Sequence, residues 1–311
     1  MKKILLLAII IRLICLYLFR NITNYDLQSY LQVGELTLKG INIYPEVANL
    51  HHPYLPLFLY IEAIVYQIGQ IGLMGQMGTI LIIKVINVFF DLGILYLVYL
   101  LSNKNLKTTL LYAINPVTVL ITTLHGQFDV IPVFFILLAI YLLKKKKELG
   151  AVLSFSFAIL TKTWPIIFFI PIAKKVKNKK LLFILFLFPV IFTLFYIWQF
   201  NATLIDIGIT VFNYQGLWGI WPSFVPILIG TTAGKGIVGL FWQKLTTIIF
   251  LAGFISYSWF KKENNLIKNV LDLLFFFFVF TTNFSIQYFV WIVPFLILIK
   301  PKNYLTLIIL I

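Results

Sequence analysis

Few side chains in this chain of 311 residues can do acid–base chemistry, because it holds only 10 Asp and Glu and 3 His. The sharpest candidate is Asp26, which follows the N-terminal apolar run within the segment NYDLQSY. A carboxylate there can act as a general base that takes a proton from a hydroxyl group. It can equally be an acidic residue in the first turn of a helix, where it complements the helix dipole. Position alone leaves both interpretations open.

Two short polar segments further along the chain carry the next candidates. LHGQFD contains His125, Gln127 and Asp129, and TKTWP contains Lys162. Gln127 and Asp129 have the groups to hydrogen-bond a polar ligand. Lys162 and His125 can place positive charge beside an anion. Each has a structural alternative, with Asp129 as a helix cap, His125 as a hydrogen-bonded turn residue and Lys162 as a snorkelling lysine.

Lys84, Asn87 and Asp91 are spaced at i, i+3 and i+7, so they share one face of a helix. Ionisable residues inside an apolar segment often mark a functional site. We favour a structural role here, with Asp91 paired to a polar side chain of a neighbouring helix, because the other candidates lie elsewhere. Arg12 lies in the first apolar run and is expected to face protein or water, or to snorkel.

The elements that position these residues must be membrane helices. The chain is 61% hydrophobic and only 11% charged, which excludes an ordinary soluble domain of this length. The net charge of +15 comes from lysines that border apolar segments, where they set topology and meet anionic lipids. No segment interleaves basic and aromatic residues as a nucleic-acid surface would. A single cysteine, Cys15, excludes an internal disulfide or cysteine metal site.

The lysine clusters predict the topology. Placing them in the cytoplasm puts the N-terminus inside and gathers the candidate residues on the extracytoplasmic side. The prediction is one all-α domain, residues 1–311, a multi-pass cell-membrane protein with about ten crossings and a truncated eleventh after residue 302. The crossings are expected at residues 4–19, 79–101, 108–124, 130–143, two short legs within 149–174, 181–200, 236–260, 270–285 and 289–299.

The first extracytoplasmic loop, residues 21–78, is expected to hold two interfacial helices. The first follows Asp26 and includes Tyr30, and the second lies within residues 53–73. A crossing by residues 53–73 would place Lys104 and Lys107 outside, against the charge rule, so the second helix is predicted to lie along the surface. The short legs on either side of LHGQFD place this turn below the outer surface, at the floor of a cavity.

An ordered set of motifs then resembles the GT-C glycosyltransferases, membrane enzymes that use polyprenyl-phosphate sugars. The resemblance rests on NYDLQSY, on GINIYP with Tyr44, on HHPYLPLF with His52 and Tyr54, and on the later segments INPVTVLITTLHGQFD, LTKTWP and QYFVWIVPFL, the last containing Gln287 and Tyr288. The nearest resemblance is to polyprenyl-phosphate-mannose-dependent mannosyltransferases, including those similar to GPI mannosyltransferase I. Some members carry a second acid in the first loop. Here Asp26 is alone, which makes a divalent metal cofactor doubtful.

The resemblance implies that Asp26 is the catalytic base of an inverting hexosyltransferase. Lys162 and His125, then Arg20, would stabilise the leaving lipid phosphate. The residues expected to contact substrate are Tyr30, Tyr44, His52, Tyr54, His125, Gln127, Asp129, Lys162, Gln287 and Tyr288. The partners would be a polyprenyl-phosphate sugar donor, a lipid-linked or surface glycan acceptor, and membrane lipids. The alternative is a transporter or flippase of lipid-linked sugars. The acceptor, the hexose and the linkage are left open.

Overall fold

The computed structural model describes residues 1–47, 52, 54–71, 75–212, 237–280 and 285–300, and these form helices joined by short connections, with no strand among them. The helices are α1 (Lys2–Leu18), α2 (Tyr25–Leu38), α3 (Ile43–Val47), α4 (Pro56–Ile71), α5 (Gly75–Leu101), α6 (Leu106–Ala113), α7 (Pro116–Leu120), the π-helix η2 (Ile121–His125), α8 (Val130–Lys144), α9 (Glu148–Thr161), the 3₁₀-helix η3 (Trp164–Phe168), α10 (Phe169–Lys175), the 3₁₀-helix η4 (Lys179–Leu181), α11 (Leu182–Phe200), α12 (Leu204–Phe212), α14 (Ile237–Phe260), α15 (Leu266–Phe280), the 3₁₀-helix η6 (Ile286–Tyr288) and α16 (Phe289–Ile299). The all-α prediction is confirmed for this part of the chain.

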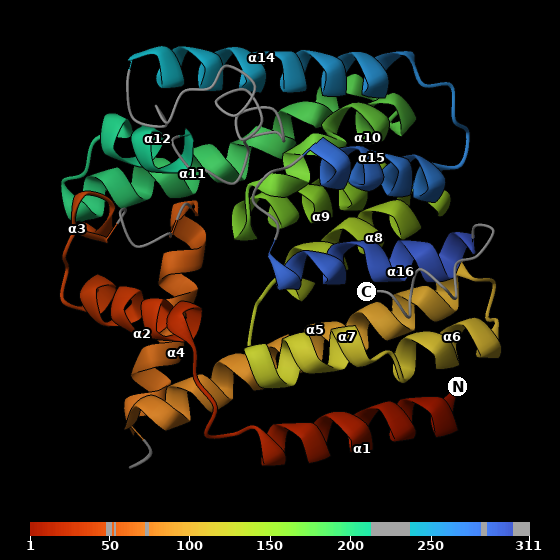
Figure 1. Ribbon diagram of the computed structural model, residues 1–311, viewed down its shortest axis with the longest axis horizontal. Helices are drawn as coiled ribbons and strands as arrows, with labels where there is room; N and C mark the ends of the chain where they lie inside the picture. The colour runs from red at the N-terminus through yellow and green to blue at the C-terminus, as the bar shows by residue number, and fades with distance from the viewer. Residues whose placement is uncertain (48–51, 53, 72–74, 213–236, 281–284, 301–311) are drawn as a thin grey trace.

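Most helices run side by side along the long axis, whereas α2, α3, α4 and α12 gather at one end (Figure 1). Helix α2 packs against α4, and α4 packs on α5. The two helices expected in the first loop are present as α2 and α4, and their place at the membrane surface stays a prediction. The same end carries Asp26, in the first turn of α2.

The segment predicted as one helix over residues 108–124 is instead broken, and that prediction was wrong. Helix α6 ends at Ala113, and α7 begins at Pro116 after a cap by Asn115, whose side-chain oxygen accepts from the Thr118 amide at 3.1 Å. Proline lacks an amide donor and is favoured in the first turn, so the Asn-Pro pair starts a new helix. The π-helix then widens the last turn before the LHGQFD segment.

The two short legs predicted within residues 149–174 are confirmed as helices. Helix α9 ends at Thr161, Lys162 is extended with φ −155° and ψ 140°, and η3 and α10 form the second leg. Proline at position 165 suits the first turn of η3 because its missing amide donor is not needed there. Lys162 therefore lies at the apex, as expected.

The helices also indicate a membrane location. Within the described residues, Gly75–Leu101 and Lys179–Phe200 are long and apolar enough to cross a bilayer, and several shorter apolar helices accompany them. Large apolar side chains such as Leu13, Phe183 and Ile248 are exposed on their helices, as lipid-facing residues would be. Eight further crossings are not apparent from helix length, and the proposed eleventh lies outside the described residues.

Candidate active site

Asp26 is placed by the cap of helix α2. Asn24 has an extended backbone, and its side-chain oxygen accepts a hydrogen bond from the Leu27 amide at 3.0 Å. This is the favoured role of asparagine at a helix N-terminus. The Asn24 amide nitrogen donates in turn to the main-chain oxygen of His125 at 2.7 Å, and it lies 3.4 Å from the His125 ring Nδ1. The start of α2 is thereby joined to the LHGQFD turn.

Gln127 bridges Asp26 and Tyr30. Its amide nitrogen donates a short hydrogen bond to Asp26 Oδ2, and its Oε1 accepts from the Tyr30 hydroxyl at 2.7 Å. Burial raises the pKa of the Tyr30 phenol well above its ordinary value, and nearby Tyr54 and Asp26 raise it further. The phenol therefore stays protonated and donates. This orients the Gln127 amide so that its nitrogen faces the carboxylate.

The LHGQFD turn depends on Gly126. Its φ of +75° is a left-handed conformation that favours glycine, and a Cβ there would lie 2.9 Å from a methyl carbon of Leu27. The turn thus packs directly on α2. Gln127 is buried, whereas Asp26 and His125 remain partly exposed.

Asp129 and Lys162 form a buried ion pair. Lys162 Nζ lies 2.8 Å from Asp129 Oδ2, and the indole nitrogen of Trp291 donates to Asp129 Oδ1 at 2.6 Å. Asp129 occupies the N-cap position of α8 but makes no side-chain capping bond. Its alternative role as a cap is therefore wrong. Lys162 is 8% exposed and bound to a carboxylate, so it does not snorkel.

Aromatic rings enclose the lysine. Its Nζ lies 4.8 Å from the centre of the Phe128 ring and 5.4 Å from that of Tyr54, within the range of cation–π attraction. Three consecutive residues of one turn therefore make different contacts. Gln127 binds Asp26, Phe128 lies beside the Lys162 ammonium, and Asp129 forms the ion pair with that ammonium.

A ring stack supports the partner of Asp129. Trp291 lies between Trp164 and Tyr288, with ring centres 3.9 and 4.2 Å away. These residues come from η3, η6 and α16. Tyr288 thus joins the site through Trp291. The other residue of the predicted pair, Gln287, accepts a hydrogen bond from Ser285, and in the described part of the chain no hydrogen bond joins it to Asp26 or Lys162.

His52 is fully buried beside Glu62. Its Nε2 lies 3.1 Å from Glu62 Oε2, although the alignment is not that of a hydrogen bond. Burial raises the pKa of Glu62, and His52 opposes that rise. The His52 ring packs edge-on against Tyr54 at 4.5 Å, and Tyr44 donates from its hydroxyl to the Tyr54 main-chain oxygen at 2.8 Å. His52 and Tyr44 thus pack against Tyr54, whose ring lies beside Lys162. His51 lies outside the described residues.

Sequence reasoning missed three residues that build the site. Asn24 could have been found as a capping residue before an acidic first turn. Glu62 had a signal too, since it interrupts an apolar stretch. Trp291 had none, because its partner Asp129 lies 162 positions away. No group of three or more His, Cys, Asp or Glu side chains suited to a metal occurs in the described part of the chain.

Comparison with known proteins then gives one match. Residues 121–219 match the family model described as Mannosyltransferase (PIG-M). The match begins in η2 and includes Gln127, Asp129 and Lys162. It covers less than half of the chain, and it confirms the resemblance to GT-C mannosyltransferases of the GPI mannosyltransferase I kind. No curated protein and no solved structure matches.

The match implies a glycosyltransferase with a sugar donor and, in general, a lipid-linked acceptor. It gives no support to a transporter or flippase. The arrangement of groups suits such chemistry, since a partly exposed carboxylate, an oriented amide and a lysine lie around one turn.

Proposed function

We propose that this protein is a membrane mannosyltransferase that moves mannose from a polyprenyl-phosphate donor to a lipid-linked or cell-surface acceptor on the extracytoplasmic face. The observation that carries the proposal is the Asp26–Gln127 contact, because Gln127 lies inside the segment that matches the mannosyltransferase model. The contact joins a candidate base to that segment across 101 positions of the chain.

Asp26 is the general base in this proposal. Gln127 occupies Oδ2 and leaves the rest of a partly exposed carboxylate for the acceptor hydroxyl. The hydroxyl proton passes to Asp26 while the oxygen attacks the anomeric carbon. The bond from that carbon to the phosphate oxygen breaks on the opposite side, so the configuration inverts and polyprenyl phosphate leaves. A hydrolase that attacks with water would instead use two carboxylates that flank the bond.

Lys162 stabilises the leaving phosphate. An ammonium has three N–H donors, and one is used by Asp129. The remaining donors are available to phosphate oxygens, and the surrounding aromatic rings exclude water and strengthen the interaction. In this proposal Asp129 orients the lysine instead of binding sugar, since it is fully buried and Lys162 and Trp291 each donate to one of its oxygens. Arg20, exposed at the end of α1, is a second cation for the donor.

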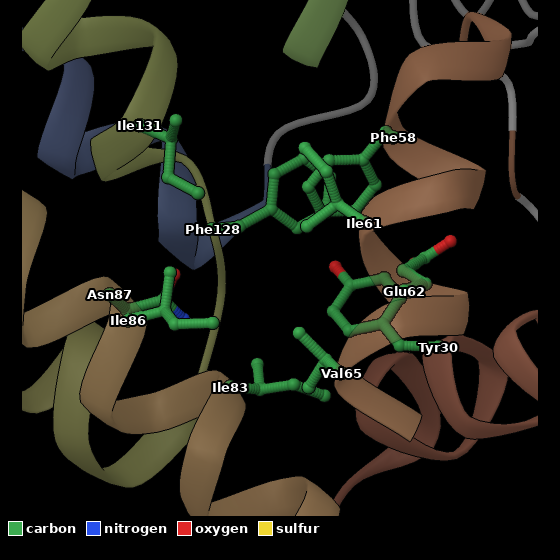
Figure 2. A pocket seen from close by; sticks show the side chains of 10 residues that line it. All are labelled: Tyr30, Phe58, Ile61, Glu62, Val65, Ile83, Ile86, Asn87, Phe128 and Ile131. Carbon is green, nitrogen blue, oxygen red and sulfur yellow. The ribbon is translucent and has the colours of Figure 1, made fainter. Parts of the chain in front are cut away.

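A small apolar cleft lies beside Tyr30, between α4 and α5. Its volume is about 30 Å³, and Figure 2 shows Phe58 and Phe128 on one side, Ile83 and Val65 on the other, and the Tyr30 hydroxyl between them. Ile83 and its neighbours Ile61 and Ile86 are partly exposed at the margin. This space is about the size of one water molecule, too small for a prenyl chain, and it ends at Tyr30, which contacts Gln127.

The topology that we propose has the lysine clusters in the cytoplasm and about ten crossings, with α9 and α10 as the short pair. The gathering of α2, α3, α4 and α12 at one end of the bundle supports it (Figure 1). Helices α2 and α4 then lie along the outer surface and roof the site.

The test uses purified protein in liposomes with radiolabelled polyprenyl-phosphate mannose and a membrane-lipid extract. We expect a mannosylated lipid from wild type and a loss of about a hundredfold or more for Asp26→Asn, the scale of general-base catalysis. Glu35→Gln is the matched control, because Glu35 is another carboxylate of α2, pairs with Lys39, and has a side chain that is 41% exposed. Equal activity of Asp26→Asn and Glu35→Gln would overturn the assignment. A wild-type protein that binds donor and forms no product with any lipid fraction would overturn the enzyme.

A further inference from the structure

One face of helix α5 reaches both chain segments that carry the proposed base and its partner. Lys84, Asn87 and Asp91 are fully or almost fully buried on this face. Asp91 binds side chains, since Arg12 and Tyr112 contact its two oxygens. Lys84 and Asn87 instead bind main-chain oxygens of irregular segments, and this difference separates them from an ordinary buried ion pair.

Lys84 holds the connection between α1 and α2. Its Nζ donates to the main-chain oxygens of Phe19 at 2.8 Å and Ile22 at 2.7 Å. Carbonyls at the end of a helix and in the following turn have no partner within the helix. The lysine satisfies two of them, and they lie four and seven positions before Asp26. The approach of the chain to the base is therefore set by α5.

Asn87 holds the other segment. Its side-chain nitrogen donates to the Gly126 main-chain oxygen at 2.8 Å, next to Gln127. Gly126 packs on Leu27 of α2 in a conformation that favours glycine. The turn is thus held between α5 on one side and α2 on the other. Lys84 and Asn87 are one helical turn apart, so a rigid helix fixes the two anchored segments relative to each other.

We propose that Lys84 and Asn87 are positioning residues that set the placement of Asp26 against Gln127. The catalytic meaning of that placement rests on the proposed function. The placement itself rests on the hydrogen bonds from Lys84 and Asn87 to the three main-chain carbonyls. A displacement of about 1 Å in a catalytic group can cost about a hundredfold in rate. The sequence suggested only a structural face here, whereas the contacts connect it to the site.

The first measurement is independent of activity. In a Cys15→Ser background, Asn24→Cys and His125→Cys report on the distance between the start of α2 and the turn, because the native side chains approach to 3.4 Å. We expect copper-phenanthroline crosslinking of this pair to be fast, and to slow at least about fivefold with Lys84→Met or Asn87→Leu, which remove an anchor of one segment. Ser156→Ala is the matched control, since Ser156 is also buried and donates to a distant carbonyl, that of Leu185, at 2.9 Å. Crosslinking that stays as fast in Lys84→Met and Asn87→Leu as in Ser156→Ala would overturn the inference.

The second measurement is mannosyl transfer by the protein with its native Asn24 and His125, in which Cys15 is the one cysteine. We expect Lys84→Met and Asn87→Leu to lower kcat about tenfold to a hundredfold with KM for the donor within about twofold, since Asp26 and its partner Gln127 are displaced and the donor site is not. Lys84→Arg keeps two donors and should recover most of the rate. In an Asp26→Asn background, Lys84→Met should change the residual rate by less than about twofold, because the base through which it acts is gone.

The two proposals fail differently. A wild-type protein without transferase activity, but with crosslinking that depends on Lys84 and Asn87, overturns the proposed function and leaves the anchoring of the two segments intact. A kcat loss for Lys84→Met that persists fully in the Asp26→Asn background overturns positioning through Asp26. Detergent gel filtration and the midpoint of thermal unfolding identify any variant that has misfolded, and if Lys84→Met misfolds, Asn87→Leu, which removes the other anchor, carries the crosslinking comparison.

Discussion

In two buried ion pairs of this protein the carboxylates make the same kinds of contact, but the cations differ. Asp91 and Asp129 are both fully buried. Each binds a cation through Oδ2, at 2.5 Å for Arg12 and 2.8 Å for Lys162. Each accepts a hydrogen bond from an aromatic side chain through Oδ1, the hydroxyl of Tyr112 or the indole of Trp291.

The cations have different freedom. The Arg12 guanidinium also donates to the main-chain oxygens of Ala8 and Ala113, and it is fully buried among α1, α5 and α6. The Lys162 ammonium has one carboxylate partner and two ring faces, and its side chain is 10% exposed. Arg12 Nη2 has no hydrogen-bond partner but is fully buried, so the arginine pair is a closed joint between helices, while the partly exposed lysine can offer donors to a ligand. Two carboxylates in similar surroundings can therefore have different roles, and the role depends on whether a ligand can reach the N–H donors of the cation.

The largest effect is expected at the arginine pair. Arg12→Leu leaves Asp91 buried without a counter-charge, which typically costs about 3–5 kcal/mol. We expect a large fall in the yield of folded protein and in the thermal midpoint in detergent. Arg12→Leu combined with Asp91→Leu should recover most of the loss, because replacing both charges removes the uncompensated one. A double variant no better than the single one would show that the pair is not a simple joint.

A smaller stability effect and a larger activity effect are expected at the lysine pair. Lys162→Gln keeps a hydrogen-bond donor for Asp129 and should cost about 1.5–3 kcal/mol, the range for a hydrogen bond to a charged group. The rate of mannosyl transfer should fall about a hundredfold, since a group that stabilises developing charge is lost. Thermal unfolding and transfer assays of the same preparation measure both. A stability loss equal to that of Arg12→Leu, with activity scaled only to the folded fraction, would erase the distinction.

The smallest effect is expected at an exposed ion pair, Lys39 with Glu35. Lys39 donates to Glu35 Oε1 at 2.5 Å, and this hydrogen bond lowers the pKa of Glu35. A lowered carboxyl pKa stabilises the fold above the ordinary pKa of 4.5, and this contribution disappears as the pH falls through the folded-state value. Because solvent screens the pair, we expect no resolvable difference between wild type and Glu35→Gln in thermal midpoint at pH 7 or pH 5. A clear difference would mean that α2 is buried in the membrane interface more deeply than its exposure indicates.

Local sequence signals predicted much of the site. Asp26 in a first helical turn, the LHGQFD turn and the apex at Lys162 all followed from apolar runs and their interruptions, which act over a few residues. The break at Asn115 and Pro116 also has a local signal, the Asn-Pro pair. The hydrophobicity of the whole segment nevertheless led to the wrong prediction of one continuous helix. Residues 213–236 and 301–311, where part of an outer loop and an eleventh crossing were expected, lie outside the described residues.

The amino-acid sequence by itself determined that the chain forms apolar helices, where most of them begin and end, and which polar residues interrupt them. Hydrophobicity, capping residues and proline act through neighbours in the chain, so these features can be read locally. Only the tertiary structure decided the pairs: Gln127 with Asp26, Lys162 with Asp129, and Lys84 with the end of α1. These partners lie far apart in sequence, and they meet because helix packing fixes the distances between side chains and leaves each buried polar group only the partners within reach.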